Sequence, residues 1–349
     1  MPVEPVTGMA PMPLDGPDDV AKLMELLQRP DSDARGLGDH LAFLAGTQPE
    51  LFRPYQEAVI TGMLGRFGVS FADQCVLLGG APDQCVEHLA RRLRHHWSFG
   101  DAWALAAIGS AAALEAIAED VRNGGDREEY ELCGVWVPPT GPARIRFSLH
   151  RRAVCLQPVN GPEELAAVDH PVGLPVDQVA QGPSATLISW HYLSLRHTDV
   201  PGLPAWPADR VHLVGVRAGY PWTLHAGIDN YGRYHNAAVT YDEPPAVEEE
   251  ETYRSLEVPG FGLGSVELRP YDADLVYCNG HIQLTPGVVG TAGGPPIGLY
   301  SNPSCPSCSR LMFHVVTVEN RIREYGDGWR SLFICEDCQT VSCNATGWN

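Results

Sequence analysis

Residues 305–338 read CPSCSRLMFHVVTVENRIREYGDGWRSLFICEDC, and this stretch decides the architecture of the C-terminal part of the chain. It contains two Cys-x-x-Cys pairs, Cys305/Cys308 and Cys335/Cys338, separated by 26 residues. Each pair can present two thiolates from one tight turn, and two such turns provide the four sulfur ligands of tetrahedral Zn²⁺. The doubled spacing therefore predicts a metal site formed by Cys305, Cys308, Cys335 and Cys338.

The segment between the two pairs has the pattern of a β-hairpin. Leu311–Val318 is an apolar strand, Tyr325–Gly328 is a glycine-containing turn, and Arg330–Ile334 is the returning strand. Such a hairpin brings the second Cys pair beside the first, which is the arrangement of a zinc ribbon over residues 301–349. Because four thiolates fill the coordination shell, the zinc is expected to be structural. Cys343 fits the spacing of neither pair and is interpreted as a bystander.

The motifs of this tail resemble those of a bacterial family. The tail resembles that of the YwqG-like family, a domain of unknown function related to programmed-cell-death-protein-two-like proteins. The resemblance is carried by Gly293–Pro296, the first Cys pair followed by Met312-Phe313, the segment Gly326–Trp329 and the second Cys pair. The resemblance implies a β-rich binding or structural module. It implies no catalytic residues.

The first part of the chain is predicted to be helical. Residues 102–121 contain two helices rich in small residues that meet at Gly109 and Ser110, where Ser110 can cap the second helix. This segment resembles a HEAT-like repeat, in which alanine at contact positions allows close stacking of helix pairs. A generic helical hairpin explains the same pattern. Residues 17–124 are therefore expected to form an α-solenoid or a helical bundle.

Four further helices are expected in this region. The first begins at Asp18 and ends at Arg29-Pro30, and another covers Glu50–Phe67. A third follows Pro82, and its apolar positions Cys85, Val86, Leu89 and Leu93 lie on one face. A short helix containing Leu41, Phe43 and Leu44 is also expected.

After the breaker Asn123–Asp126, the hydrophobic pattern changes to short alternating runs. We expect a β-rich domain over residues 130–300, to which the zinc ribbon over residues 301–349 also belongs. A disordered leader over residues 1–16 is expected before the helical region. The fold class is therefore α+β with several domains. The expected strands are Ala153–Leu156, Thr186–Trp190, Arg210–Val216, Ala237–Tyr241 and Leu275–Tyr277, and weaker helical patterns cover Glu163–Val168 and Pro175–Ala180.

The charge and the absence of targeting patterns restrict the function. The chain of 349 residues carries 43 acidic and 24 basic residues, for a formal net charge of −19. The electrostatic field of such a negative charge repels the phosphates of a nucleic acid. The predicted ribbon, residues 301–349, contains four arginines against five acids and so offers no basic patch, and we expect no nucleic-acid partner. Neither a secretory signal nor a membrane-spanning run is recognised, which predicts a cytoplasmic location with reduced thiols.

Two groups of histidines are the remaining candidates for chemistry. His191 with His197, and His225 with His235, could each hold a catalytic metal if the chain folded them together. Neither spacing matches an HExxH motif or another known frame, so a purely structural role is favoured for these histidines. The expected function is thus a zinc-stabilised interaction or scaffold protein that binds an unidentified protein or peptide. A metal-dependent enzyme using one of these histidine pairs is the alternative.

Overall fold

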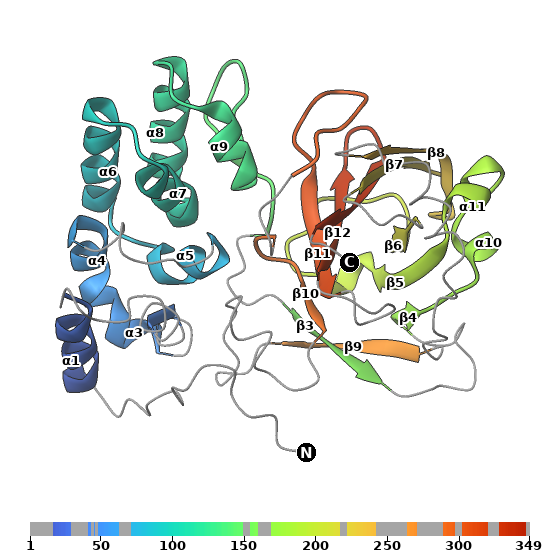
Figure 1. Ribbon diagram of the computed structural model, residues 1–349, viewed down its shortest axis with the longest axis horizontal. Coiled ribbons are helices and arrows are strands. Elements are labelled where there is room, and N and C mark those ends of the chain that lie inside the picture. Colours follow the sequence, from blue (N-terminus) through green and yellow to red (C-terminus); the bar gives the residue numbers. More distant parts are fainter. Residues whose placement is uncertain are drawn as a thin grey trace, which may run out of the picture. The chain divides into compact units, whose positions relative to one another are not determined.

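The computed structural model describes residues 17–28, 41, 42, 45, 48–62, 71–148, 154–159, 169–216, 222–241, 264–270, 289–296, 302–319 and 328–346. These residues belong to two compact units, with the boundary between Ile145 and Arg146. The first unit is mainly helical and the second is built on β-strands, so the chain is an α+β protein (Figure 1). Within the described residues, we find no helix with the length and apolar character needed to cross a membrane.

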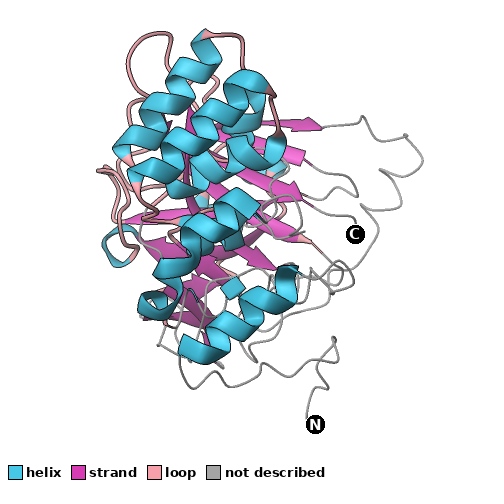
Figure 2. Cartoon of the chain, turned by 90° about the vertical axis from the view of Figure 1, so that its left-hand side faces the viewer, coloured by secondary structure: helices cyan, strands magenta, loops and turns pink. Residues whose placement is uncertain are grey.

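The first unit consists of helices followed by a short β-hairpin, and Figure 2 views its helices face on. Its elements are α1 (Pro17–Gln28), α3 (Pro49–Phe52), the 3₁₀ helix η1 (Arg53–Tyr55), α4 (Gln56–Gly62), α5 (Phe71–Leu78), α6 (Asp83–His95), α7 (Phe99–Ile108), α8 (Ala111–Arg122), α9 (Arg127–Leu132), β1 (Val135–Trp136) and β2 (Arg144–Ile145). Helix α7 is central, because it contacts α5, α6, α8 and α9.

The amphipathic pattern after Pro82 is confirmed in α6. The four predicted core positions are buried, whereas the arginines between them are exposed. Helix α7 differs because most of its residues are buried, as expected for an alanine-rich helix surrounded by others. Gly109 ends α7 with a left-handed φ of 60°, and the Ser110 hydroxyl accepts a hydrogen bond from the Ala113 amide at the start of α8. The predicted joint between two helices is therefore confirmed.

Several helix boundaries differ from the sequence expectation. The helix expected over residues 50–67 is divided into α3, η1 and α4, because Pro54 lies in the 3₁₀ turn and cannot donate an amide hydrogen bond. The breaker at 123–126 is followed by another helix, α9, since Asp126 caps the Glu128 amide. Helix α5 was not predicted. Residues 41, 42 and 45 are helical, as expected for the short helix there.

The second unit contains an antiparallel nine-stranded sheet in the order β4-β9-β3-β10-β11-β12-β13-β7-β8. Its strands are β3 (Val154–Val159), β4 (Pro171–Val172), β7 (Trp222–Ile228), β8 (Tyr234–Tyr241), β9 (Gly264–Pro270), β10 (Gly290–Ala292), β11 (Phe313–Glu319), β12 (Trp329–Cys335) and β13 (Thr340–Thr346). Strands β5 (Trp190–Arg196) and β6 (Arg210–Gly215) form a separate antiparallel pair. The short helices α10 (Val176–Val179), α11 (Pro183–Leu187) and η4 (His197–Asp199) complete the unit.

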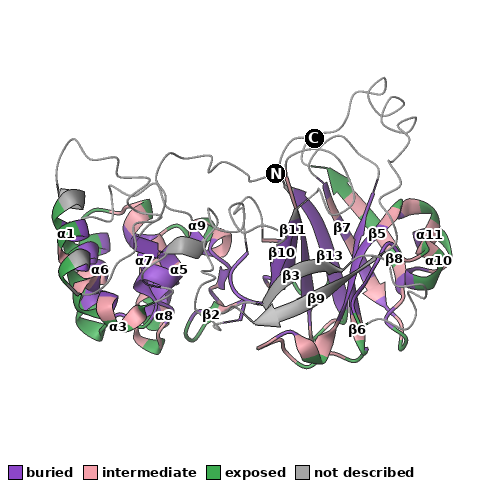
Figure 3. Ribbon diagram, turned by 90° about the horizontal axis from the view of Figure 1, so that it is seen from below, coloured by how far each residue is buried: buried purple, intermediate pink, exposed green. Residues whose placement is uncertain are grey.

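The core of this unit lies between the β5–β6 pair and one face of the large sheet. Its buried members include Leu193 of β5, Leu213 of β6, Leu332 of β12 and Val341 of β13. Alternate residues of β12 point to opposite faces, and yet all its residues after Trp329 are buried. The middle of the sheet is therefore buried on both faces, and β10 and β11 are coloured as buried in Figure 3.

The strand predictions have mixed outcomes. Strands β6, β11 and β12 lie where alternating apolar residues predicted them. The strand expected over Thr186–Trp190 is wrong, because α11 begins at Pro183 and includes Thr186, and β5 starts only at Trp190. Strands β7, β9 and β13 were not predicted. Candidate elements at Glu163–Val168 and Leu275–Tyr277, and the leader over residues 1–16, lie outside the described residues.

Candidate metal centre

The first Cys pair lies in a tight turn that precedes β11. The Cys305 amide donates to the Arg310 carbonyl oxygen at 2.8 Å, and the Ser309 amide donates to the Cys305 carbonyl oxygen at 2.8 Å. Ser309 has a φ of 56°, the left-handed conformation that closes such a turn. An isolated bridge between Ser304 and Leu311 fixes the base of the turn. Cys305 is consequently buried and Cys308 exposed.

The second Cys pair forms the turn between β12 and β13. Cys335 is the last residue of β12 and pairs with Thr340, the first residue of β13. Gln339 closes this turn with a φ of 52°. Because β11 and β12 are antiparallel, with Phe313 opposite Ile334, the start of β11 lies beside the end of β12. The hairpin therefore brings the two turns together.

The four sulfur atoms form a compact cluster. All four Sγ atoms lie within 4.8 Å of one another, and the Sγ atoms of Cys308 and Cys335 are 3.7 Å apart. A tetrahedral Zn²⁺ with Zn–S bonds of about 2.3 Å requires S···S distances of about 3.8 Å, so the cluster has the dimensions of a four-sulfur metal site. All four cysteines are free thiols. They can hold a metal ion without rearrangement of the backbone.

The thiols titrate unequally because their surroundings differ. Burial raises the pKa of the Cys305 thiol, but hydrogen bonds from the amides of Ser307 and Cys308 outweigh it, and the pKa lies below its usual value. Burial and the neighbouring Cys305 hold the pKa of Cys335 well above its usual value. Four thiolates at this separation repel one another, and a bound cation removes that repulsion.

Arginine side chains neutralise the two acids inside the second Cys turn. Arg146 is buried and donates two hydrogen bonds to the Glu336 carboxylate, at 2.9 and 2.7 Å, and a third to the Leu311 carbonyl oxygen at 2.8 Å. Arg146 thereby connects both Cys turns. The Glu336 carboxyl is partly buried, which raises its pKa, but the bonds from Arg146 lower it below its usual value. Arg310 also pairs with Asp337.

Cys343 lies away from the cluster. It is fully buried in β13 within the apolar core, and burial raises the pKa of its thiol to about 12. Its Sγ atom lies 3.8 Å from the carbonyl oxygen of His212. This position agrees with the interpretation of Cys343 as a bystander.

The structure places His191 and His197 at opposite ends of β5. They are six positions apart along a chain that is mostly extended, a distance of roughly 20 Å. His191 Nδ1 accepts a hydrogen bond from the Leu174 amide at 3.0 Å, so its Nε2–H donates to the Ser194 hydroxyl at 2.8 Å. His197 Nε2 donates to the Pro204 carbonyl oxygen at 2.7 Å. Both imidazoles therefore support the local backbone.

The second histidine pair lies on neighbouring strands. The ring of His235 on β8 lies over Gly227, two residues along β7 from His225. Burial lowers the pKa of His225, and its Nδ1 has no hydrogen-bond partner among the described residues. Across the described residues, however, only the four cysteines form a group of three or more candidate ligands. Neither histidine pair is joined by a third ligand in that part of the chain.

Comparison of the chain with protein-family models, with curated proteins and with solved structures finds no significant match. The resemblance of residues 293–338 to the YwqG-like family therefore stays a prediction, as does the HEAT-like interpretation. The functional argument consequently depends on the cysteine cluster and on the side chains that surround it.

Proposed function

We propose that Cys305, Cys308, Cys335 and Cys338 bind one structural Zn²⁺. The observation that carries this proposal is the compact four-sulfur cluster, whose S···S separations suit tetrahedral Zn²⁺. Four thiolates leave no open coordination position for substrate or activated water. The ion would instead hold together the turns at the ends of β11 and β12, and a reducing compartment such as the cytoplasm would keep the thiols available.

We further propose that the protein acts as an interaction or scaffold protein with a protein or peptide partner. Tyr231, in the turn between β7 and β8, is 82% exposed, and the Arg233 guanidinium lies 5.6 Å from the centre of its ring. An exposed aromatic side chain beside an arginine is the composition that dominates binding energy at protein interfaces. If the helical unit is a HEAT-like solenoid and the sheet is YwqG-like, both would be binding modules rather than catalytic ones.

Metal analysis tests the zinc site. We expect elemental mass spectrometry of the purified chain to find one zinc ion per molecule. Cys305→Ser and Cys335→Ser should each lose most of that zinc, because the remaining three ligands bind far less tightly. Cys343→Ala is the matched control, since Cys343 is another buried cysteine of the same sheet and should keep the full amount.

The result that contradicts a purely structural site is a second metal that exchanges readily and is lost in His225→Ala or His191→Ala. That outcome would favour the metal-dependent enzyme.

The interaction proposal is tested separately. A protein that is captured on this chain is purified, and its direct binding to the chain is then measured. We expect Tyr231→Ala to weaken this binding about tenfold or more, as for an interface hot spot, and Tyr241→Ala, 38% exposed at the far end of β8, to leave it unchanged. Equal binding by all three proteins would contradict it.

A further inference from the structure

The second half of α6 carries a row of basic side chains. His88, Arg91, Arg92 and His95 occupy positions i, i+3, i+4 and i+7, which lie on one side of a helix. They stand out in a chain whose formal net charge is −19. Basic residues near a helix C-terminus favour the helix dipole, which accounts for their presence in part. The surroundings of the row indicate more.

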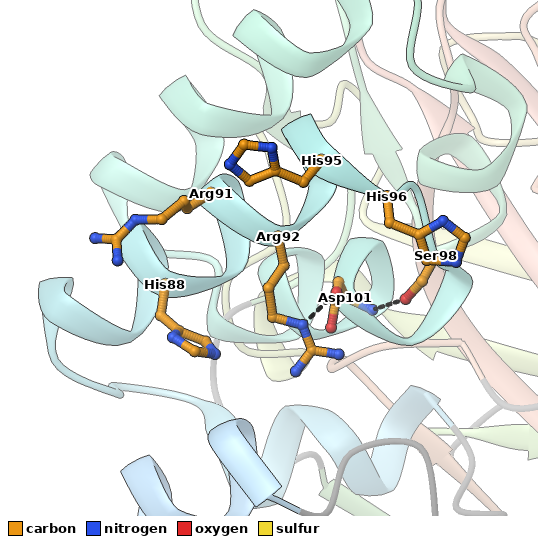
Figure 4. Close-up of a pocket in the computed structure, with 7 residues that line it drawn as sticks. All are labelled: His88, Arg91, Arg92, His95, His96, Ser98 and Asp101. Carbon is orange, nitrogen blue, oxygen red and sulfur yellow. Dashed lines mark hydrogen bonds and ion pairs between the residues drawn. The ribbon is translucent and has the colours of Figure 1, made fainter.

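The row lines a pocket of about 260 Å³ that also includes His96, Ser98 and Asp101 (Figure 4). All seven residues belong to the helical unit, in α6, in the connection to α7 and in the first turn of α7. Sites for drug-sized ligands begin at roughly 300 Å³, so this pocket suits a smaller group. We call it the α6 pocket.

The pocket keeps an excess of positive charge. Its one acid, Asp101, is 2% exposed and is neutralised by Arg92, whose Nε lies 3.0 Å from the carboxylate Oδ2. This contact leaves the terminal nitrogens of Arg92 as further donors, and Figure 4 shows the Arg92 side chain between those of His88 and Asp101. Within the described residues, Arg91 forms no ion pair or hydrogen bond. The pocket therefore contains one guanidinium, that of Arg91, that no acid among the described residues compensates.

A buried ring nitrogen in the same pocket has no partner. His88 Nε2 is shielded from solvent and makes no hydrogen bond to any described residue. A shielded polar atom without a partner is destabilising, and a ligand oxygen that reached this ring nitrogen would remove that cost. Guanidinium and imidazole side chains thus line one small cavity together.

We propose that the α6 pocket binds a phosphate group, as the free ion or as a phosphomonoester on a small molecule. Phosphate carries up to two negative charges and accepts hydrogen bonds at several tetrahedrally arranged oxygens, which matches donors that approach from several residues. A planar carboxylate satisfies only one arginine fork. A nucleic acid is disfavoured because the acidic chain repels an extended polyanion, whereas a single phosphate senses chiefly the local charge.

Calorimetric titration of the full chain with inorganic phosphate, at constant ionic strength, tests this proposal. We expect saturable binding of one phosphate, with acetate much weaker. Arg91→Gln and His88→Gln should each raise the dissociation constant about tenfold or more, because each removes a donor to a charged ligand. Arg94→Gln is the matched control, since Arg94 is on the same helix, is 54% exposed and lies outside the pocket. It should leave the dissociation constant unchanged.

Circular dichroism should show that the variants retain the wild-type fold, since Arg91 is exposed. Titration with O-phosphoserine distinguishes the two sources: binding equal to that of phosphate indicates a phosphomonoester, and its exclusion indicates the free ion. Absence of phosphate binding at millimolar concentration overturns the proposal. So does an equal loss in Arg91→Gln and Arg94→Gln, which would reveal non-specific attraction.

Discussion

Arg146 shows how a single side chain supports the cysteine cluster. Its guanidinium donates hydrogen bonds to both carboxylate oxygens of Glu336 and to a carbonyl oxygen of the first Cys turn. The backbone carbonyl oxygen of Arg146 also accepts a hydrogen bond from the His314 amide at 2.8 Å. Its guanidinium also lies 5.7 Å from the centre of the Phe313 ring. Residues that orient metal ligands through such contacts commonly change metal affinity when they are replaced.

We predict that Arg146→Ala destabilises the β-rich unit by about 3 kcal/mol. The reason is that the substitution leaves the Glu336 carboxylate partly buried without its partner, and the side chains of Arg146 and Glu336 are only 9% and 22% exposed. Zinc affinity should fall about tenfold or more. Urea unfolding measures the first effect, and competition with a coloured chelator measures the second.

Arg310→Ala is the control for this prediction. Arg310 pairs with Asp337 in the same turn, but their side chains are 31% and 51% exposed. Solvent screens such a pair, so its loss should cost less than about 1 kcal/mol. Equal destabilisation by the two substitutions would show that burial of Arg146 has no special importance.

At the scale of elements, the joint between α7 and α8 depends on two adjacent residues. Gly109 provides the left-handed conformation that ends α7, and the Ser110 hydroxyl accepts the Ala113 amide at 3.2 Å. We predict that Gly109→Ala lowers the free energy of unfolding by about 1–2 kcal/mol, because a Cβ atom is disfavoured at positive φ. Thermal and urea unfolding followed by circular dichroism measure this change.

Gly62→Ala is the matched control for the helix joint. Gly62 is the last described residue of α4 and has no positive φ, and an added Cβ atom would meet no atom of the described residues within 4 Å. Alanine there should raise stability by about 0.4–1 kcal/mol, because it restricts the unfolded chain. If both substitutions had the same sign, the conformation of Gly109 would not explain its role.

Local patterns predicted those elements whose signal lies within a few residues. The four cysteines carry their geometry in their spacing, and the buried face of α6 follows from its helical period. Strand β13 escaped prediction because Ser342 and Asn344 are polar although the fold buries both. Arg146 lies 190 positions from Glu336, and no neighbour in the sequence indicates that contact. Such contacts are set by the pairing of distant strands.

The whole molecule contains buried histidines whose titration affects its stability. In the β-rich unit, burial lowers the pKa of both His212 and His314 to about 4. Each has partners that suit a neutral ring: Ser194 lies 2.7 Å from His212 Nδ1, and Thr317 lies 2.8 Å from His314 Nε2. Protonation of either ring in the folded state would remove a hydrogen-bond acceptor, Nδ1 of His212 or Nε2 of His314.

We predict that the protein loses stability as the pH falls from about 6.5 to 4. A histidine in the unfolded chain binds a proton near pH 6.5, whereas His212 and His314 do so only near pH 4, so the unfolded state binds more protons in this window. Their contribution is therefore complete above pH 6.5 and is lost progressively below it, by a few kcal/mol in total. The lowered pKa of Glu336 adds a further loss below its usual value of 4.5.

Urea unfolding between pH 4 and 8 measures this dependence. The imidazole resonances in NMR spectra report the titration of each histidine directly. Acid would also protonate the thiolates and release the proposed zinc, so the comparison requires a variant. His314→Asn should flatten the pH dependence relative to the wild type, whereas His95→Asn, which replaces an exposed histidine, should leave it unchanged. Loss of the proposed zinc would be common to all three proteins and would cancel in the comparison. Identical pH profiles for the wild type and His314→Asn would show that the buried imidazole does not contribute to acid sensitivity.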